Sequence, residues 1–209
     1  MNIDYTLYLC TNTKLMSTNT IEECVEEAIL GGVSIVQVRE KNINTLKFLK
    51  ISKAVKKITS KYNVPLIIND RIGIALAINA DGVHLGQNDI SCAIARKILG
   101  KKKIIGISVN NLEQAIKAKK QGANYIGVGA MFRSKTKPDA KIVSIDELKK
   151  IKSNVDLPIV LIGGINKNTI PFFGDYDIAG YAMITPIISQ NDIRKSAKEL
   201  LKIIQLNKK

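Results

Sequence analysis

Short apolar runs rich in β-branched residues recur along the chain at intervals of about 20 to 35 residues, and an amphipathic segment follows nearly every one. This alternation is typical of repeated strand–helix units. The runs that we interpret as strands are 5–11, 33–39, 66–69, 82–85, 104–109, 125–129, 159–162 and 181–185. The weakest helix follows the seventh run, because Pro171 and two phenylalanines in 168–173 favour a short or irregular element.

Eight such units, with no linker or break in composition between them, predict a single α/β domain over 1–209. Strands that are apolar along their whole length indicate a parallel sheet covered on both faces, and eight units usually close into a (β/α)8 TIM barrel. The alternative is an open doubly wound sheet. That fold usually has a glycine-rich first turn, whereas 11–14 reads Thr-Asn-Thr-Lys.

The net charge of +14 suggests nucleic-acid binding until the positions of the lysines are considered. In 44–62, apolar side chains recur at helical spacing, and the opposite side carries Lys47, Lys50, Lys53, Lys57 and Lys61. Other segments repeat this pattern, so the charge is spread over several helices and is not gathered into one stripe. We therefore expect no nucleic-acid partner, although a diffuse positive field would concentrate small phosphate esters.

Other global features indicate a cytoplasmic protein without a membrane partner. No apolar stretch approaches the roughly 18 residues of a membrane span, and the N-terminus lacks the pattern of a signal peptide. Cys10, Cys24 and Cys92 are odd in number and widely spaced, which favours buried free thiols over disulfides or a zinc site.

In a barrel of this kind, functional residues gather where the strands end, so we searched those positions for reactive side chains. The period of two along the second strand places Gln37, Arg39 and Lys41 on one side, which we assign to the barrel interior and mouth. The structural alternative is that the two cations pair with Glu40 or with neighbouring carboxylates.

Two aspartates follow adjacent strands: Asp70 comes after the third, and Asp89 after the fourth. Mg²⁺ prefers one or two carboxylates together with phosphate oxygens and water, so this pair predicts a magnesium site. Two structural alternatives remain open. Asp89 or Ser91 could cap the next helix, and Asp70 could pair with Arg71.

Strands four and five carry further polar residues. His84, the single histidine, lies between Val83 and Leu85 and fits a hydrogen-bonded strand residue better than a catalytic base. Gly106 is expected to open space for a ligand, and Ser108, without a histidine partner, is not expected to be a nucleophile.

The loop after strand six offers Ser134, Thr136 and Lys137, which could close over phosphate groups. A solvated basic loop is the alternative. Gly163 and Gly164 after strand seven would allow the backbone to approach a phosphate, and the loops after strands seven and eight are common phosphate sites in barrels.

Taken in order, these segments closely resemble the thiamine phosphate synthase family over nearly the whole chain. The matching segments are Gln37–Lys41, Ile68–Arg71, Gly82–Asp89, Gly106–Ser108, Tyr125–Gly129, Thr136–Lys137 and Ile162–Ile165.

The resemblance implies an Mg²⁺-dependent transferase that couples 4-amino-2-methyl-5-(diphosphooxymethyl)pyrimidine to a thiazole phosphate and releases pyrophosphate. It implies that the pyrimidine diphosphate is held by Gln37, Val38, Arg39, Glu40, Lys41, Asn69, Ser108 and Lys137, with Mg²⁺ on Asp70 and Asp89. It implies that the thiazole phosphate is held by Ser134, Lys135, Thr136, Gly164, Ile184 and Thr185. Pro186 has no amide hydrogen, so a donor at that position would have to be lost or replaced by water.

Three other functions compete with this one. A thiazole tautomerase shares the barrel but would need an acid–base residue, and that family carries a histidine where this chain has Asn110. The others are a non-catalytic sensor of phosphate ligands and a nucleic-acid-binding module. Turnover with both substrates separates the first two from the synthase, and salt-dependent affinity for arbitrary DNA would support the third.

Overall fold

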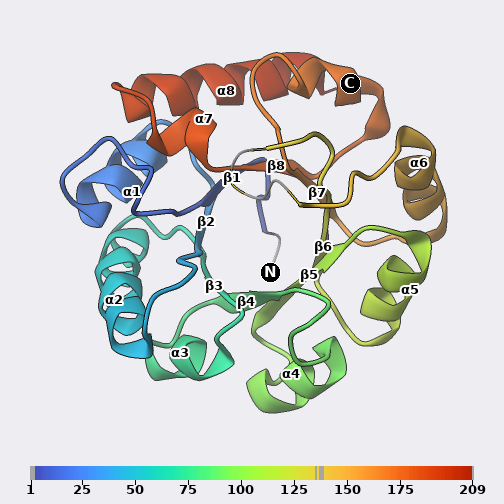
Figure 1. Ribbon diagram of the computed structural model, residues 1–209, viewed down its shortest axis with the longest axis horizontal. Coiled ribbons are helices and arrows are strands. Elements are labelled where there is room, and N and C mark those ends of the chain that lie inside the picture. Colours follow the sequence, from blue (N-terminus) through green and yellow to red (C-terminus); the bar gives the residue numbers. More distant parts are fainter. Residues whose placement is uncertain (1–2, 135, 137–138, 209) are drawn as a thin grey trace.

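The protein forms a closed barrel of eight parallel strands (Figure 1). Its structure is a computed structural model that describes residues 3–134, 136 and 139–208. The strands are β1 (Leu7–Cys10), β2 (Ile35–Val38), β3 (Leu66–Asn69), β4 (Gly82–Leu85), β5 (Ile104–Val109), β6 (Tyr125–Val128), β7 (Ile159–Ile162) and β8 (Gly180–Met183). Each pairs with its neighbours in chain order, and β8 pairs with β1, so the sheet has no free edge.

Helices form an outer ring around these strands (Figure 1). They are α1 (Ile21–Leu30), α2 (Thr45–Lys61), α3 (Ile72–Ala77), α4 (Cys92–Leu99), α5 (Leu112–Lys120), α6 (Ile145–Asn154), the 3₁₀ helix η1 (Ile170–Tyr176), α7 (Thr185–Ile188) and α8 (Ile193–Asn207). The last helix packs beside the first, where Arg194 donates from Nε to Glu27 at 2.9 Å. Among the helices of the described residues, none is long and apolar enough to cross a membrane.

Alternation along each strand separates two buried layers. Leu7 and Leu9 of β1 face the helices and join the large core between strands and helices, whereas Tyr8 and Cys10 point into the barrel. The interior layer also contains Tyr5 from the segment before β1. This segment crosses the centre of the barrel in Figure 1, and the ring of Tyr5 packs against that of Tyr125 with centroids 4.8 Å apart.

The predicted (β/α)8 fold is confirmed, and β3, β4, β5 and β7 begin and end at the predicted residues. The segment after β7 is an irregular 3₁₀ helix, as Pro171 suggested. Along α2, Phe48 and Val55 are buried, and the predicted solvent face is exposed at Lys47, Lys50, Lys53, Lys57 and Lys61. The three cysteines are free and buried.

The other strand boundaries were wrong. The predicted strands 5–11, 33–39 and 125–129 were too long, because β1, β2 and β6 span only Leu7–Cys10, Ile35–Val38 and Tyr125–Val128. Strand eight was expected to reach position 185, but it ends at Met183, and Thr185 already begins α7. Pro186 explains the early end, because its fixed φ suits the first turn of a helix and it cannot donate to a sheet ladder.

Candidate functional site

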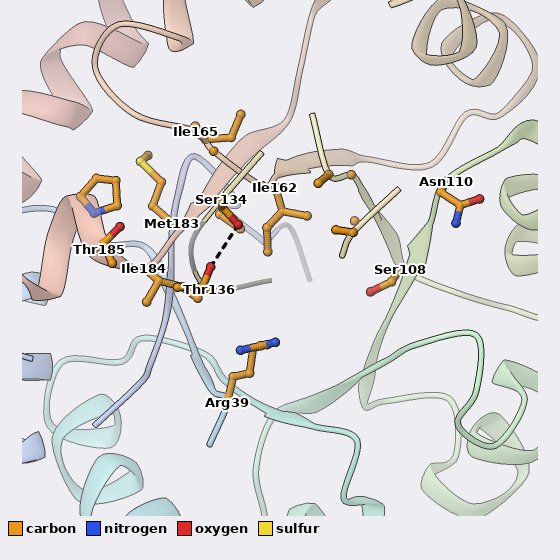
Figure 2. A pocket seen from close by; sticks show the side chains of 18 of the residues that line it. Arg39, Ser108, Asn110, Ser134, Thr136, Ile162, Ile165, Met183, Ile184 and Thr185 are labelled. Atoms are coloured by element: carbon orange, nitrogen blue, oxygen red, sulfur yellow. Dashed lines mark hydrogen bonds between the residues drawn. The ribbon is translucent and has the colours of Figure 1, made fainter. Parts of the chain in front are cut away.

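A cavity of about 220 Å³ opens at the carboxyl ends of the strands (Figure 2). Residues from β2, β5, β6, β7 and β8 and from the segments that follow them line it. They include Arg39, Ser108, Asn110, Gly129, Ser134, Thr136, Gly163, Gly164, Ile184, Thr185 and Pro186. The predicted clustering of polar residues at this end of the barrel is thus present.

One side of the mouth is built from small residues and hydroxyls. The hydroxyl oxygens of Ser134 and Thr136 lie 3.2 Å apart, and both side chains project into the cavity from the segment after β6 (Figure 2). The neighbouring segment after β7 contains Gly163 and Gly164, whose φ values of +91° and +67° are rarely adopted by L-residues. This side therefore presents hydroxyls and backbone where a phosphate could approach closely.

The tight contact between the segments after β6 and β7 depends on Gly164. A Cβ atom there would lie 2.5 Å from Cβ of Phe132 and 2.9 Å from the carbonyl oxygen of Arg133. Since both contacts are shorter than real Cβ atoms show, any larger residue would push the two segments apart. Gly164 thus sets the width of this part of the cavity.

The other side of the mouth is charged. The ammonium of Lys41 forms an ion pair with Asp70, whose φ of +62° turns the chain sharply after β3. The Asp89 carboxylate accepts a hydrogen bond from the backbone N–H of Gly86 at 2.7 Å. Ser91, not Asp89, caps α4, since its hydroxyl oxygen accepts from the N–H of Ile94.

The two aspartates lie close enough to affect one another. Partial burial and the carboxylate of Asp70 both raise the pKa of Asp89, and burial is the larger cause. Asp70 does not pair with Arg71, whose guanidinium instead donates to the carbonyl of Ile43 at 2.8 Å. Two adjacent carboxylates repel each other, and a divalent cation bound between them would relieve that repulsion. These residues therefore fit Mg²⁺.

This pair alone would not enclose a metal. Within the described residues, no group of three or more His, Cys, Asp or Glu side chains could hold an ion. Mg²⁺ commonly takes one or two carboxylates and completes its shell with water and phosphate oxygens. The donor set therefore fits a magnesium ion that is held jointly with a phosphorylated ligand.

A second, smaller cavity of about 60 Å³ lies deeper in the barrel and shares Arg39, Ser108 and Gly127 with the first. Gln37 and Asn69 also line it. The guanidinium of Arg39 and the side-chain amide of Asn69 form no hydrogen bond or ion pair with any residue in 3–134, 136 or 139–208. Both groups are therefore available to a ligand that enters from the mouth.

Other polar side chains that line this cavity are already paired with one another. Nδ1 of His84 lies 2.9 Å from the hydroxyl of Tyr125, and its Nε2 lies 2.8 Å from the hydroxyl of Ser108. Burial lowers the pKa of His84 to about 4. A neutral, doubly hydrogen-bonded histidine agrees with its interpretation as a strand residue and makes it a weak base.

Two expectations about β5 were wrong. Ser108 does have a histidine partner: His84 is in register with Gly106 of β5, and its ring reaches the hydroxyl of Ser108 two residues further along. Gly106 does not open space for a ligand: a Cβ atom there would lie 2.1 Å from the ring of Tyr125, so the missing side chain makes room for that tyrosine. The pattern of one strand did not show which neighbour would fill the gap.

The remaining predicted residues occupy different environments. The side chain of Val38 is buried between strands and helices. The Glu40 carboxylate accepts from the hydroxyls of Thr11 at 2.6 Å and Thr13 at 2.8 Å. These two side chains are engaged away from the cavity. Lys135 and Lys137 lie outside the described residues.

Sequence reasoning missed Tyr8 and Tyr125, which lie inside the barrel beside the site. Tyr8 has the same strand parity as Cys10, and Tyr125 the same parity as Gly127. A tyrosine at an interior position needs a hydrogen-bond partner, which is a signal that could have found both.

The fold and the mouth define a class: a (β/α)8 barrel with a site for phosphorylated ligands at the carboxyl ends of its strands. A family model described as thiamine monophosphate synthase matches residues 7–187. The chain therefore belongs to the thiamine monophosphate synthase family.

Individual relatives agree. The chain is 55% identical over 201 residues to a thiamine-phosphate synthase of Ruminiclostridium cellulolyticum, covering 96% of each chain. It is 52% identical over 198 residues to one of Clostridium botulinum, covering 95% of this chain and 93% of the relative. A solved thiamine phosphate pyrophosphorylase of Pyrococcus furiosus superposes with a TM-score of 0.88 at 36% identity, over 98% of this chain and 97% of that one.

Proposed function

We propose that this chain is a transferase that joins the aminopyrimidine diphosphate to the thiazole phosphate, forming thiamine phosphate and pyrophosphate. The observation that carries the proposal is the pair of connected cavities at the mouth, of about 60 and 220 Å³, which share Arg39 and Ser108. Such an arrangement suits two small substrates held side by side. Family membership supports the same reaction.

In this proposal the pyrimidine diphosphate occupies the deeper cavity. Gln37 and Asn69 would face the pyrimidine ring, and Ser108 would lie at the edge of that ring. Arg39 would contact the diphosphate where the ligand passes from the deeper cavity into the mouth. Val38 and Glu40 would contribute through the backbone, since their side chains are engaged elsewhere. For Lys41 and Lys137 we propose charge neutralisation of the diphosphate, Lys137 by family resemblance alone.

The thiazole phosphate would occupy the larger cavity. Ser134, Thr136 and Thr185 supply hydroxyls, while Gly164 and Ile184 supply backbone and shape. Lys135 belongs to the same set by resemblance. Hydrogen bonds from neutral hydroxyls and backbone amides to an anionic phosphate are stronger than bonds between neutral groups, so few such donors are needed.

We propose Asp70 and Asp89 as the residues that hold Mg²⁺, supported by their closeness and by the raised pKa of Asp89. When bound, the ion would neutralise charge that develops on the departing pyrophosphate. The ammonium of Lys41, now paired with Asp70, would then be free to contact the same phosphate oxygens.

The reaction breaks the bond between the methylene carbon and the diphosphate oxygen, and the bonding electrons leave with pyrophosphate. Arg39 stabilises the growing negative charge, which is a larger effect in the transition state than in the bound substrate. The resulting pyrimidine-methyl cation accepts the lone pair of the thiazole nitrogen. Because that nitrogen carries no proton, no general base is required, and the neutral, weakly basic His84 suits such a site.

The finer features of the protein are part of the same proposal. We propose that residues 1–209 act as one catalytic domain, that the protein works in the cytoplasm, and that its partners are small molecules. The diffuse distribution of lysines over the helices supports the last point.

The test uses purified protein with both substrates and Mg²⁺, and measures thiamine phosphate and pyrophosphate together. We expect equal amounts of the two products, and loss of both when the metal is chelated. Absence of product, or proton exchange on the thiazole phosphate without condensation, would overturn the proposal. Arg194→Ala, an exposed substitution on α8, serves as the control because its ion pair with Glu27 is remote from the mouth.

A further inference from the structure

Five side chains form an unbroken chain of hydrogen bonds across the barrel interior. Nε2 of Gln37 donates to the hydroxyl of Tyr8 at 2.8 Å, and that hydroxyl lies 2.8 Å from the hydroxyl of Tyr125. Tyr125 continues to His84 at 2.9 Å, and His84 to Ser108 at 2.8 Å. All five side chains line the deeper cavity, and Gln37 and Ser108 form the two ends of the hydrogen-bonded chain.

Of the three inner members of the chain, Tyr8 and Tyr125 are fully buried and His84 is partly buried. Burial raises the pKa values of Tyr8 and Tyr125 well above their usual range, and both ring nitrogens of His84 face neutral hydroxyls and no carboxylate, so all three side chains are taken as neutral. Each hydroxyl therefore has one proton to donate, and the imidazole has one N–H. As a result, all bonds of the chain must point the same way, and the direction at one end determines the direction at the other.

Only two directions exist, and they present opposite groups to a ligand. If Gln37 donates to Tyr8, then Tyr125 donates to Nδ1 of His84, and Nε2–H donates to Ser108. The Ser108 hydroxyl is then free to donate into the mouth, and Gln37 presents its carbonyl oxygen beside its second N–H. In the opposite direction, the amide of Gln37 is flipped so that its oxygen accepts from the hydroxyl of Tyr8. The hydroxyl of Ser108 then donates to Nε2 of His84 and has no proton left for a ligand.

We propose that the chain runs from Gln37 to Ser108 and that Tyr8, Tyr125 and His84 thereby select an aminopyrimidine over an oxopyrimidine. This inference rests on the proposed function, which places the pyrimidine ring against Gln37. Although Tyr8, Tyr125 and His84 also line the cavity, their proposed role is to position, because they set the direction in which Gln37 and Ser108 donate and accept hydrogen bonds.

Two observations favour this direction. The bond from Nε2 of Gln37 to Tyr8 leaves the amide oxygen as the outward acceptor. At the other end, Ser108 shares the mouth with the cation of Arg39, where an anionic ligand is expected, and a hydroxyl that donates suits such a ligand.

The selectivity follows from the edge of the ring. An aminopyrimidine offers a donor amino group next to an acceptor ring nitrogen, which matches the carbonyl oxygen and N–H of Gln37 in this direction. The 4-oxo analogue offers an acceptor next to a ring N–H. Its oxygen would face the carbonyl oxygen of Gln37, and its N–H would face the N–H of Gln37, so neither hydrogen bond could form. Buried donors or acceptors left unpaired are costly, and sites built on them reject the wrong ligand strongly.

The direction can be read directly by nitrogen NMR, because His84 is the only histidine in the chain. In wild-type protein labelled with ¹⁵N at histidine, we expect a neutral ring protonated at Nε2 and unprotonated at Nδ1, both without ligand and with the aminopyrimidine diphosphate. A ring protonated at Nδ1, or a doubly protonated ring at neutral pH, would overturn the proposal.

The selectivity is tested by comparing kcat/KM for the amino and 4-oxo pyrimidine diphosphates. We expect wild type to prefer the amino form by at least about 100-fold, and Tyr125→Phe and Tyr8→Phe to reduce this preference by about tenfold each. Tyr5→Phe is the matched control, since Tyr5 packs against Tyr125 with ring centroids 4.8 Å apart and its hydroxyl takes no part in the chain. An equal loss of preference in Tyr5→Phe, or an unchanged preference in both other variants, would contradict the proposal.

The two proposals fail in different ways. If wild type forms no thiamine phosphate, the proposed function fails, while the tautomer of His84 in ligand-free protein still reports the direction of the chain. If wild type forms product but uses both pyrimidines equally, the function stands and the selectivity role fails. The NMR measurement uses wild-type protein. It therefore still decides the direction of the hydrogen bonds if one of the variants does not fold.

Discussion

Around the mouth of the barrel, the side formed after β2, β3 and β4 differs from the side formed after β6, β7 and β8 in what it offers a ligand. The first side, which we call the charged side, carries Lys41, Asp70 and Asp89 and borders on Arg39. The second, which we call the small-residue side, carries Ser134, Thr136, Gly163, Gly164 and Thr185. The charged side contributes side chains, whereas much of the small-residue side contributes backbone and space.

This difference predicts different responses to substitution. A charge that faces a transition state acts on the chemical step, so its loss should lower kcat. Hydroxyls and backbone groups that hold a phosphate remote from the broken bond bind substrate and transition state alike, so their loss should raise KM. The predictions below test this division, beginning with the largest expected effect.

Arg39→Ala should lower kcat by about 10²- to 10³-fold, the loss associated with one preorganised charge-stabilising donor. The guanidinium forms no ion pair with a described residue, so the free energy of unfolding should change by no more than about 1 kcal/mol. Single-turnover rates with both substrates saturating, together with thermal unfolding, measure the two effects. A normal single-turnover rate would remove Arg39 from the chemical step.

Asp89→Asn should weaken the apparent affinity for Mg²⁺ by about 100-fold. Even the loss of a residue that only orients a metal ligand lowers metal affinity by about 10- to 100-fold. The pKa of Asp89 is raised, so the folded protein disfavours its charged form, and the neutral amide should leave the metal-free protein equally or more stable. Magnesium titration of activity and thermal unfolding without metal are the measurements. Asp156→Asn, at an exposed surface pair with Lys119, is the control. An unchanged magnesium response would contradict the metal assignment.

Gly164→Ala should raise KM for the thiazole phosphate by about tenfold and destabilise the fold by about 1–3 kcal/mol. Both effects follow from the positive φ and from the contact with Phe132. Gly100→Ala is the matched control: Gly100 has a φ of +73°, but a Cβ atom there would meet nothing within 4 Å. We expect the control to lose stability and keep its KM. If both variants raised KM alike, the effect would come from general strain.

Thr136→Val should have the smallest effect, raising KM for the thiazole phosphate by about 5- to 10-fold with kcat unchanged, because it removes one hydrogen bond worth about 1 kcal/mol. Thr136→Ser keeps the hydroxyl and should behave like wild type. Steady-state kinetics of both variants test this. A fall in kcat in Thr136→Val would show that the small-residue side also acts on the chemical step.

The charged side was largely predictable from the sequence. Lys41, Asp70 and Asp89 were identified because each follows a strand, and parallel strands end at the same face of a barrel. The hydroxyls and glycines of the small-residue side were also identified by position. The close contact between Gly164 and Phe132 could not be predicted from the sequence, because it depends on how the segments after β6 and β7 pack against each other.

The sequence by itself determined the barrel. Runs with a period of two for strands and 3.6 for helices are local signals, and eight of them in alternation leave few other ways to bury the apolar faces. The same reasoning explains why Tyr8 and Cys10 point inward while Leu7 and Leu9 point toward the helices.

Only the tertiary structure decided how the interior residues pair. His84 is in register with Gly106, and its ring reaches Ser108 two residues further along β5. Tyr125 of β6 is also in register with Gly106, and its ring fills the space there. Each of these contacts joins two different strands, so no pattern within one strand contains it. The periodicity of a strand determines which way a side chain points, whereas the closure of the barrel determines what it meets.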